Sequence, residues 1–211
     1  MAAVARMFGN GMASSARVLG IDPGLVRTGW AVLEPAGLRA RVLGHGVITP
    51  PQDAPLPARL AAGAQRLREV LGEFTPDLVA LEEVFTAPRH PRSALLMAHM
   101  RGAICLVVEE AGLPVLPLTA TTVKQRLTSS GHASKEQIQR MVQRLTGIDS
   151  TARMRLDETD AVALALAALY QRSHPLARLS AAARPSPALV NARDAAAKRG
   201  TLQPDRNGES R

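Results

Sequence analysis

The chain has 211 residues, of which 46% are hydrophobic but only 2% aromatic, and its formal net charge is +8. This length fits one ordinary domain with tails, and the apolar content is sufficient for a core of aliphatic side chains. The single cysteine, Cys105, excludes an internal disulfide and a cysteine-rich zinc site, and its apolar surroundings predict a buried structural thiol. Because no apolar run reaches the roughly 18–20 residues of a membrane helix, we expect a soluble protein with no membrane partner.

The positive charge is concentrated in the C-terminal part of the chain. Residues 171–211 carry eight Lys or Arg and three Asp or Glu, whereas residues 17–170 carry 17 and 15. A basic tail attracts anionic partners without specifying them, so the charge gives little support for nucleic acid. The Ala/Arg/Pro/Ser-rich residues 173–211 are predicted to be disordered. Residues 1–16 are interpreted as a disordered leader or a start assigned too early, which leaves residues 17–172 as the folded domain.

The predicted elements begin with three strands, at residues 17–22, 28–34 and 41–49, separated by turns at 23–24 and 35–37. The order continues with a helix at 58–74, a strand at 77–82, a helix at 93–111, a strand at 114–118, and helices at 134–145 and 156–170. A meander followed by strand–helix–strand units predicts an α/β fold with a mixed five-stranded sheet and helices on both faces. In that sheet the first and fourth strands can be central neighbours.

Four carboxylates occur at the ends of apolar segments. Asp22 ends one apolar run, Glu82 ends another, and Asp157 and Asp160 open the most apolar helix of the chain. Taken singly, these acids have structural explanations: a turn aspartate, a strand-end glutamate, and acids favoured by a helix dipole. An unpaired buried carboxylate costs several kcal/mol, however, and hard divalent cations prefer oxygen ligands. Four independent structural explanations are less expected than a single shared site. The pattern therefore favours a metal centre at which these segments converge.

Lysine is rare in this chain, since only three of its 26 Lys and Arg residues are lysines. They are Lys124, Lys135 and Lys198. Lysine offers a compact point charge suited to a phosphate, without the planar fork of arginine. Lys124 and Lys135 are therefore candidates for phosphate contacts. From composition alone, two ordinary solvated lysines are an equal alternative.

Four segments together are similar to one known family. They are GIDPGLVRTGWAV at 20–32, LEEVF at 81–85, VKQ at 123–125 with ASK at 133–135, and DETDA at 157–161. In this order they resemble RuvC, the Holliday-junction resolvase of bacterial recombination, over roughly residues 17–170. The resemblance implies an RNase H-like fold and a homodimer that cleaves four-way DNA junctions in recombination and repair. It also implies a cytoplasmic, nucleoid-associated protein with the RuvA–RuvB branch-migration complex as a partner.

The resemblance also implies roles for individual residues. Asp22, Glu82, Asp157 and Asp160 match the catalytic acids, which would hold two Mg²⁺ ions, or Mn²⁺ in their place, around the scissile phosphate. Glu82 is assigned in preference to Glu83 by its motif position. Lys124 and Lys135 match phosphate-contacting lysines, and Phe85 matches an aromatic that stacks on junction bases, its alternative being a lid over the core. Arg89 and Arg92 follow in the same loop and are expected to contact the DNA backbone, unless the loop is simply solvated. His132 is a candidate for approach to a phosphate, without a catalytic role.

The predicted helix at 93–111 has apolar side chains on several faces. One face can cover the sheet and another can contact a partner subunit, whereas complete burial in the core is the alternative. Sequence does not separate the two.

Three rival functions have different discriminating observations. A nucleotide-binding module of the actin and sugar-kinase type shares the Asp-x-Gly motif but would be stabilised by ATP, and it leaves Asp157, Asp160 and the lysines unexplained. A junction-binding protein without nuclease activity would tolerate Asp22→Asn. A general RNase H-like ribonuclease would cut an RNA–DNA hybrid faster than a junction.

Overall fold

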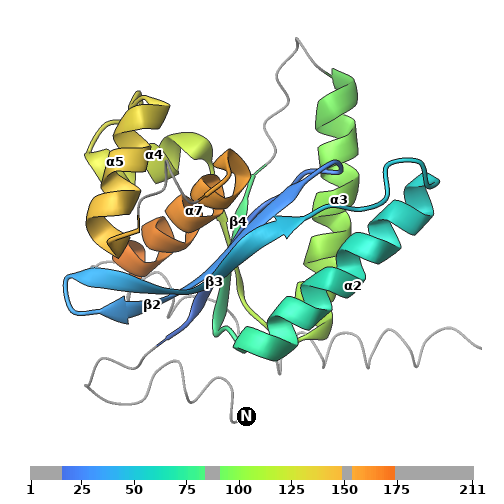
Figure 1. The fold of residues 1–211 in the computed structure, drawn as a ribbon, viewed down its shortest axis with the longest axis horizontal. Coiled ribbons are helices and arrows are strands. Elements are labelled where there is room, and N and C mark those ends of the chain that lie inside the picture. Colours follow the sequence, from blue (N-terminus) through green and yellow to red (C-terminus); the bar gives the residue numbers. More distant parts are fainter. Residues whose placement is uncertain (1–15, 84–90, 149–153, 174–211) are drawn as a thin grey trace, which may run out of the picture. The chain divides into compact units, whose positions relative to one another are not determined.

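The computed structural model describes residues 16–83, 91–148 and 154–173. A five-stranded sheet with the strand order β3-β2-β1-β4-β5 forms its centre (Figure 1). The strands are β1 (Val18–Asp22), β2 (Thr28–Ala36), β3 (Arg39–Ile48), β4 (Leu78–Glu82) and β5 (Val115–Leu118). β1, β2 and β3 form an antiparallel meander, while β4 and β5 run parallel to β1. The predicted mixed sheet, with the first and fourth strands adjacent, is confirmed.

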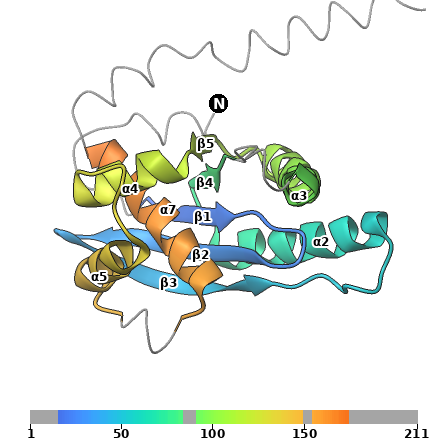
Figure 2. The same cartoon turned by 90° about the horizontal axis from the view of Figure 1, so that it is seen from above.

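Helices cover both faces of the sheet, as predicted (Figure 1 and Figure 2). One face carries α2 (Leu56–Phe74) and α3 (Pro91–Glu110), and the other carries α4 (Ala120–Thr128), α5 (Lys135–Thr146) and α7 (Leu156–Ser173). Each face has its own hydrophobic cluster of buried residues. The sheet therefore separates two cores, and its strand ends are left for polar residues.

Strand β1 shows why both faces are covered. Val18 belongs to the cluster under α4, α5 and α7, whereas Leu19 and Ile21 belong to the cluster under α2 and α3. This alternation follows the two-residue period of a strand, and both sets are buried. Gly20 lies directly beneath α7, because a Cβ at this position would be 2.1 Å from the backbone oxygen of Ala161. The absence of a side chain at Gly20 thus lets α7 pack against the central strand.

Helix α7 is apolar on every side, and residues 161–169 are all buried. A helix that is hydrophobic all round belongs in a core rather than on a surface. Its first turn, in contrast, carries the acids Asp157, Glu158 and Asp160. The helix therefore anchors its polar N-terminal turn firmly against the sheet.

Two local predictions were wrong. Helix α4 was not predicted, although Thr119 caps it by accepting a hydrogen bond from the backbone N–H of Thr122. The turn expected at 35–37 begins later, because β2 continues through Pro35 to Ala36 and turns at Gly37, whose φ is +64°. β1 ends its pairing with β2 at Leu33, so Pro35 lies where β2 has no neighbour on that side. A missing N–H is tolerated at such an edge position.

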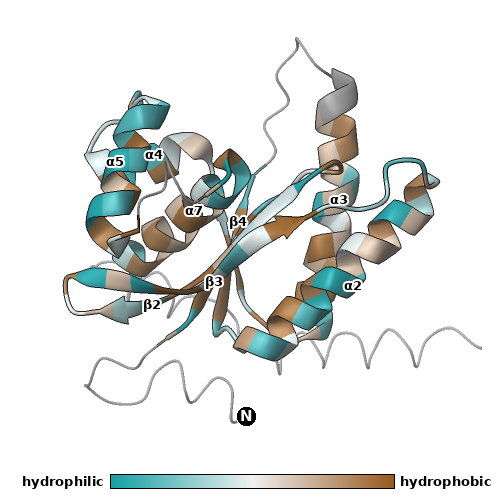
Figure 3. Ribbon diagram, viewed as in Figure 1, coloured by the Kyte–Doolittle hydropathy of each residue, from teal (hydrophilic) through white to brown (hydrophobic). Residues whose placement is uncertain are grey.

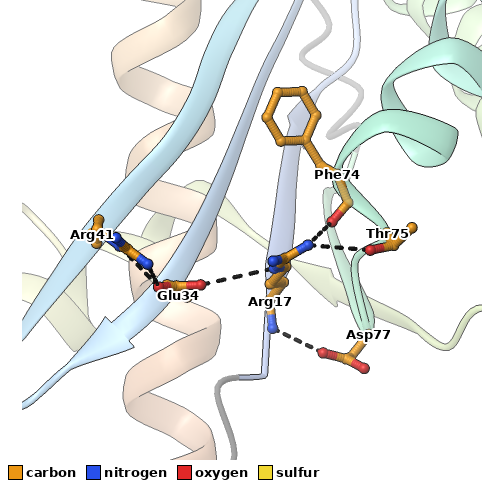
Figure 4. Close-up of polar contacts among 6 residues, drawn as sticks. All are labelled: Arg17, Glu34, Arg41, Phe74, Thr75 and Asp77. Carbon is orange, nitrogen blue, oxygen red and sulfur yellow. Dashed lines mark hydrogen bonds and ion pairs between the residues drawn. The ribbon is translucent and has the colours of Figure 1, made fainter.

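A buried acid on β2, Glu34, is neutralised by arginines (Figure 4). Glu34 is 8% exposed and forms an ion pair with Arg41 and a longer one, at 3.8 Å, with Arg17. Arg17 also donates to the backbone oxygen of Phe74 at 2.8 Å, and its backbone N–H donates to Asp77 at 2.9 Å. These contacts tie β1 to the connection between α2 and β4, and they satisfy the buried charge of Glu34 within the protein.

Cys105 is half-buried in α3 and packs against the cluster between this helix and the sheet, so its predicted burial is only partial. Within the described residues, no helix is long and apolar enough to cross a membrane. The predictions for residues 1–16 and 173–211 fall almost entirely on positions outside the described ranges.

Candidate active site

Two of the four candidate acids lie side by side at one edge of the sheet. Asp22 is the last residue of β1 and Glu82 the last residue of β4, and the preceding residues, Ile21 and Leu81, are paired in the parallel ladder. Their side chains share a hydrogen bond. Glu83, the alternative considered from the sequence, is exposed. The strand register therefore places Glu82 beside Asp22.

The other two acids reach this edge through a glycine contact. Gly29 on β2 is the ladder partner of Asp22. A Cβ at Gly29 would be 2.0 Å from the backbone oxygen of Asp157, so only a residue without a side chain lets the first turn of α7 approach here. Asp160 lies one helical turn further, and residues three apart share a face of a helix.

The carboxyl groups affect each other's protonation. Burial, the hydrogen bond to Glu82 and repulsion from Glu82 and Asp157 raise the pKa of Asp22 from 3.8 to about 8, against an opposing effect of Lys135. Burial and repulsion from Asp22 and Asp157 raise the pKa of Asp160 from 3.8 to about 6, against opposing effects of Lys135 and Lys124. The four acids and both candidate lysines thus occupy one electrostatic neighbourhood.

The two candidate lysines lie on helices whose first residues are fixed by capping hydrogen bonds. Lys135 is the first residue of α5, which begins with a capping box in which Ser134 and Gln137 exchange hydrogen bonds. Lys124 lies in the middle of α4, whose start is fixed by Thr119. Lys124 is half-buried and Lys135 is exposed, so both ammonium groups can contact a ligand that lies beside the acids.

An ion pair and a histidine contact that sequence reasoning missed join the first turn of α7 to the sheet side of the site. Arg27 Nε lies 2.9 Å from Asp157 Oδ2, and His45 Nδ1 lies 3.4 Å from Glu158 Oε1. Arg27 belongs to the loop between β1 and β2, and His45 belongs to β3. The only available signal was the occurrence of Arg27 in the same motif as Asp22, which does not identify a partner 130 positions away.

The donor set fits a hard divalent cation. Glu34 has arginine partners for its buried charge, whereas Asp22 and Asp160 are half-buried beside other acids with only partial compensation from lysine. Carboxylate oxygens are the ligands that Mg²⁺ and Mn²⁺ prefer, and a cation would relieve the mutual repulsion. Across residues 16–83, 91–148 and 154–173, no three His, Cys, Asp or Glu side chains are yet gathered as a ready-made ligand set. Asp22, Glu82, Asp157 and Asp160 are the residues whose oxygens would hold such a cation.

The remaining candidate residues are placed as follows. Phe85 and Arg89 lie outside the described residues. Arg92 belongs to the first turn of α3, and the structure describes its backbone but not its side chain. His132 is exposed in the connection between α4 and α5. Contacts of these residues with DNA stay predictions.

Comparisons with known proteins identify the family of this chain. The family model described as "Crossover junction endodeoxyribonuclease RuvC" matches residues 18–168. A relative with that description from Bordetella avium is 42% identical over 169 residues, which cover 78% of this chain and 92% of the relative. Another from Maricaulis maris is 41% identical over 162 residues, covering 76% and 95%.

Solved structures extend the comparison to the fold. The RuvC of Thermus thermophilus in complex with a Holliday junction substrate has a TM-score of 0.69 and 34% identity, covering 74% of this chain and 94% of that one. The yeast mitochondrial Holliday junction resolvase Ydc2 has a TM-score of 0.55 at 14% identity, covering 83% and 89%, and shares the fold alone. The family model matches most of the chain, and the two relatives are each more than 40% identical to it. This chain therefore belongs to the RuvC family of crossover junction endodeoxyribonucleases.

Proposed function

We propose that this protein resolves four-way DNA junctions by paired symmetric nicks, as an endodeoxyribonuclease of homologous recombination and repair. The observation that carries the proposal is the meeting of Asp22 and Glu82 with the acidic first turn of α7 at one sheet edge. The junction-bound relative from Thermus thermophilus supports the choice of substrate.

The four acids would hold the metal. Asp22, Glu82, Asp157 and Asp160 fit two Mg²⁺ or Mn²⁺ ions, which when bound would activate the attacking water and stabilise the leaving 3′ oxygen. Asp22 and Asp160 serve as ligands only when deprotonated. Because their pKa values are raised to about 8 and about 6, cation binding is expected to strengthen as the pH rises through this range.

Lys124 and Lys135 would hold the DNA backbone at the acids. Both oppose the pKa shift of Asp160, and Lys135 also opposes that of Asp22, so their charges act on the site itself. Four acids repel a phosphate, and two ammonium groups at the same edge reduce that repulsion. Phe85, Arg89 and Arg92 would extend the contact, with the aromatic ring stacked on a base and the arginines on phosphates.

A homodimer would give one site for each of two opposing strands. Helix α3 is largely hydrophobic along its length (Figure 3), and Leu95 and Leu106 are 61% and 59% exposed. Exposed His99 and Gly102 lie between them on the same helix face. A four-way junction has approximate two-fold symmetry, so a two-fold dimer built on this face would match it. RuvA–RuvB would be a further partner, and the protein would act in the cytoplasm at the nucleoid.

A panel of substrates tests the proposal against its rivals. The purified protein is incubated in Mg²⁺ with a mobile four-way junction, a linear duplex of the same sequence and an RNA–DNA hybrid. Preferential cleavage of the junction is expected, and no thermal stabilisation by ATP. Faster cleavage of the hybrid would favour a ribonuclease, binding of the junction without nicks would favour an architectural protein, and stabilisation by ATP would favour a nucleotide-binding module.

A further inference from the structure

Among the residues that the structure describes, Arg27 is the basic residue in closest contact with the candidate acids. Its Nε lies 2.9 Å from Asp157 Oδ2, and the side chains are 56% and 26% exposed. Among ion pairs of the described residues, this one alone includes a candidate metal ligand. Arg27 thus occupies one of the two carboxylate oxygens of Asp157, a candidate metal ligand.

The loop that carries Arg27 is fixed, while its side chain has room to move. Thr28 Oγ1 donates to the backbone oxygen of Gly24 at 2.8 Å, and Arg59 donates to the backbone oxygen of Leu25 at 2.9 Å. A cavity of about 230 Å³ adjoins the ion pair. It is lined by Gly24, Leu25, Val26, Arg27, Leu96, Met97 and Asp157. The guanidinium can therefore leave Asp157 by a side-chain rotation, without movement of the loop.

Guanidinium and a divalent cation compete for the same carboxylate oxygen and repel each other at that distance. We propose that Arg27 is a charge-exchange residue: it neutralises Asp157 in the cation-free protein and moves to a phosphate of the junction once a cation takes Asp157. This inference rests on the proposed function.

A structural role for Arg27 predicts a different outcome. If Arg27 only orients Asp157 for the cation, its removal weakens cation binding. If the pair is merely a surface ion pair, its removal leaves cation binding unchanged, since exposed pairs contribute little. Competition predicts that cation binding strengthens when Arg27 is removed, and the transfer of the guanidinium to a phosphate is tested separately by the salt dependence of junction binding.

The test is calorimetric titration of Mn²⁺ into the full chain without DNA, for the wild type, Arg27→Gln, Arg68→Gln and Asp22→Asn. Arg68 is a matched control, because it pairs with Glu110 at the same 2.9 Å between α2 and the C-terminal end of α3. Arg27→Gln is expected to bind Mn²⁺ about two- to fivefold more tightly, as the modest strength of an exposed ion pair dictates. Arg68→Gln should match the wild type, and Asp22→Asn should lose binding.

A second arm follows the guanidinium to the DNA. Junction affinity is measured against salt concentration in EDTA and in Ca²⁺, under conditions where no nicks form. In EDTA, where Arg27 pairs with Asp157, Arg27→Gln should show the same salt slope as the wild type, whereas in Ca²⁺ it should lose about one phosphate contact from that slope. Weaker or unchanged Mn²⁺ binding by Arg27→Gln, with a normal wild type, overturns the charge exchange alone. Failure of the wild type to bind Mn²⁺ overturns the proposed metal site and the inference together.

Discussion

Substitution of Gly29 by alanine probes how closely α7 must approach the sheet. The new Cβ would lie 2.0 Å from the oxygen, 2.5 Å from the carbonyl carbon and 3.2 Å from the Cα of Asp157. All three atoms are backbone, so no side-chain rotation relieves the contact. The first turn of α7 must retreat by about 1 Å or more to reach an ordinary contact of 3.4 Å. Asp157 and Asp160 would move away from Asp22 with it.

The magnitude follows from this displacement. Forced overpacking of a core typically destabilises a protein by about 1–3 kcal/mol, which denaturant unfolding followed by circular dichroism would measure. A misplacement of about 1 Å at a catalytic group slows reaction by roughly 100-fold. Single-turnover cleavage of a junction, at a temperature where Gly29→Ala is fully folded, should therefore show about this loss.

Gly72→Ala provides the control. Gly72 is exposed within α2, and a Cβ there meets no atom within 4 Å. This variant should gain about 0.5–1 kcal/mol of stability from helix propensity and cleave at the wild-type rate. If folded Gly29→Ala also cleaved at the wild-type rate, the claim that close approach of α7 assembles the site would be wrong.

Three further predictions concern charge and assembly. In EDTA, Asp22→Asn should be about as stable as the wild type at pH 4 and up to about 5 kcal/mol more stable at pH 9, as measured by calorimetry. The reason is that folding raises the pKa of Asp22 from 3.8 to about 8, so the wild type has its full stability below pH 4 and loses it as the pH rises through about 8. Glu34→Gln, in contrast, should lose about 0.5–1 kcal/mol in denaturant unfolding without altering site chemistry, because it removes the ion pair of Glu34 with Arg41, whose side chain is 68% exposed; an unchanged midpoint would contradict this. Leu106→Glu should yield monomers in analytical ultracentrifugation, and a persistent dimer would place the subunit contact elsewhere than the exposed face of α3.

The sheet was predictable from the sequence because its signals are local. Runs such as 18–21 and 78–81 are apolar and end at an acid, and short connections restrict the first three strands to a meander. The order with β1 beside β4 then places Asp22 and Glu82 at one edge, as the structure shows. Helix α4 escaped prediction because it has only nine residues, with Val123 and Leu127 as its buried pair.

The details of the site were not predictable, because they depend on contacts between distant segments. Gly29 reads as an ordinary strand glycine, and only the packing of α7 shows that it touches Asp157. The ion pair of Arg27 with Asp157 joins a loop and a helix whose relative placement is set by two separate cores. Acid positions could be inferred from pattern, whereas their charge partners required the fold.

The most direct test of the central claim is cleavage of an end-labelled mobile four-way junction by the wild type, Asp22→Asn and Glu34→Gln, with and without Mg²⁺. One acid cluster acting as a metal-dependent nuclease predicts paired symmetric nicks by the wild type and Glu34→Gln in Mg²⁺ alone, with the linear duplex intact. Asp22→Asn should bind the junction and leave it uncut. Nicks by Asp22→Asn at the wild-type rate, or nicks by the wild type in EDTA, would contradict the account.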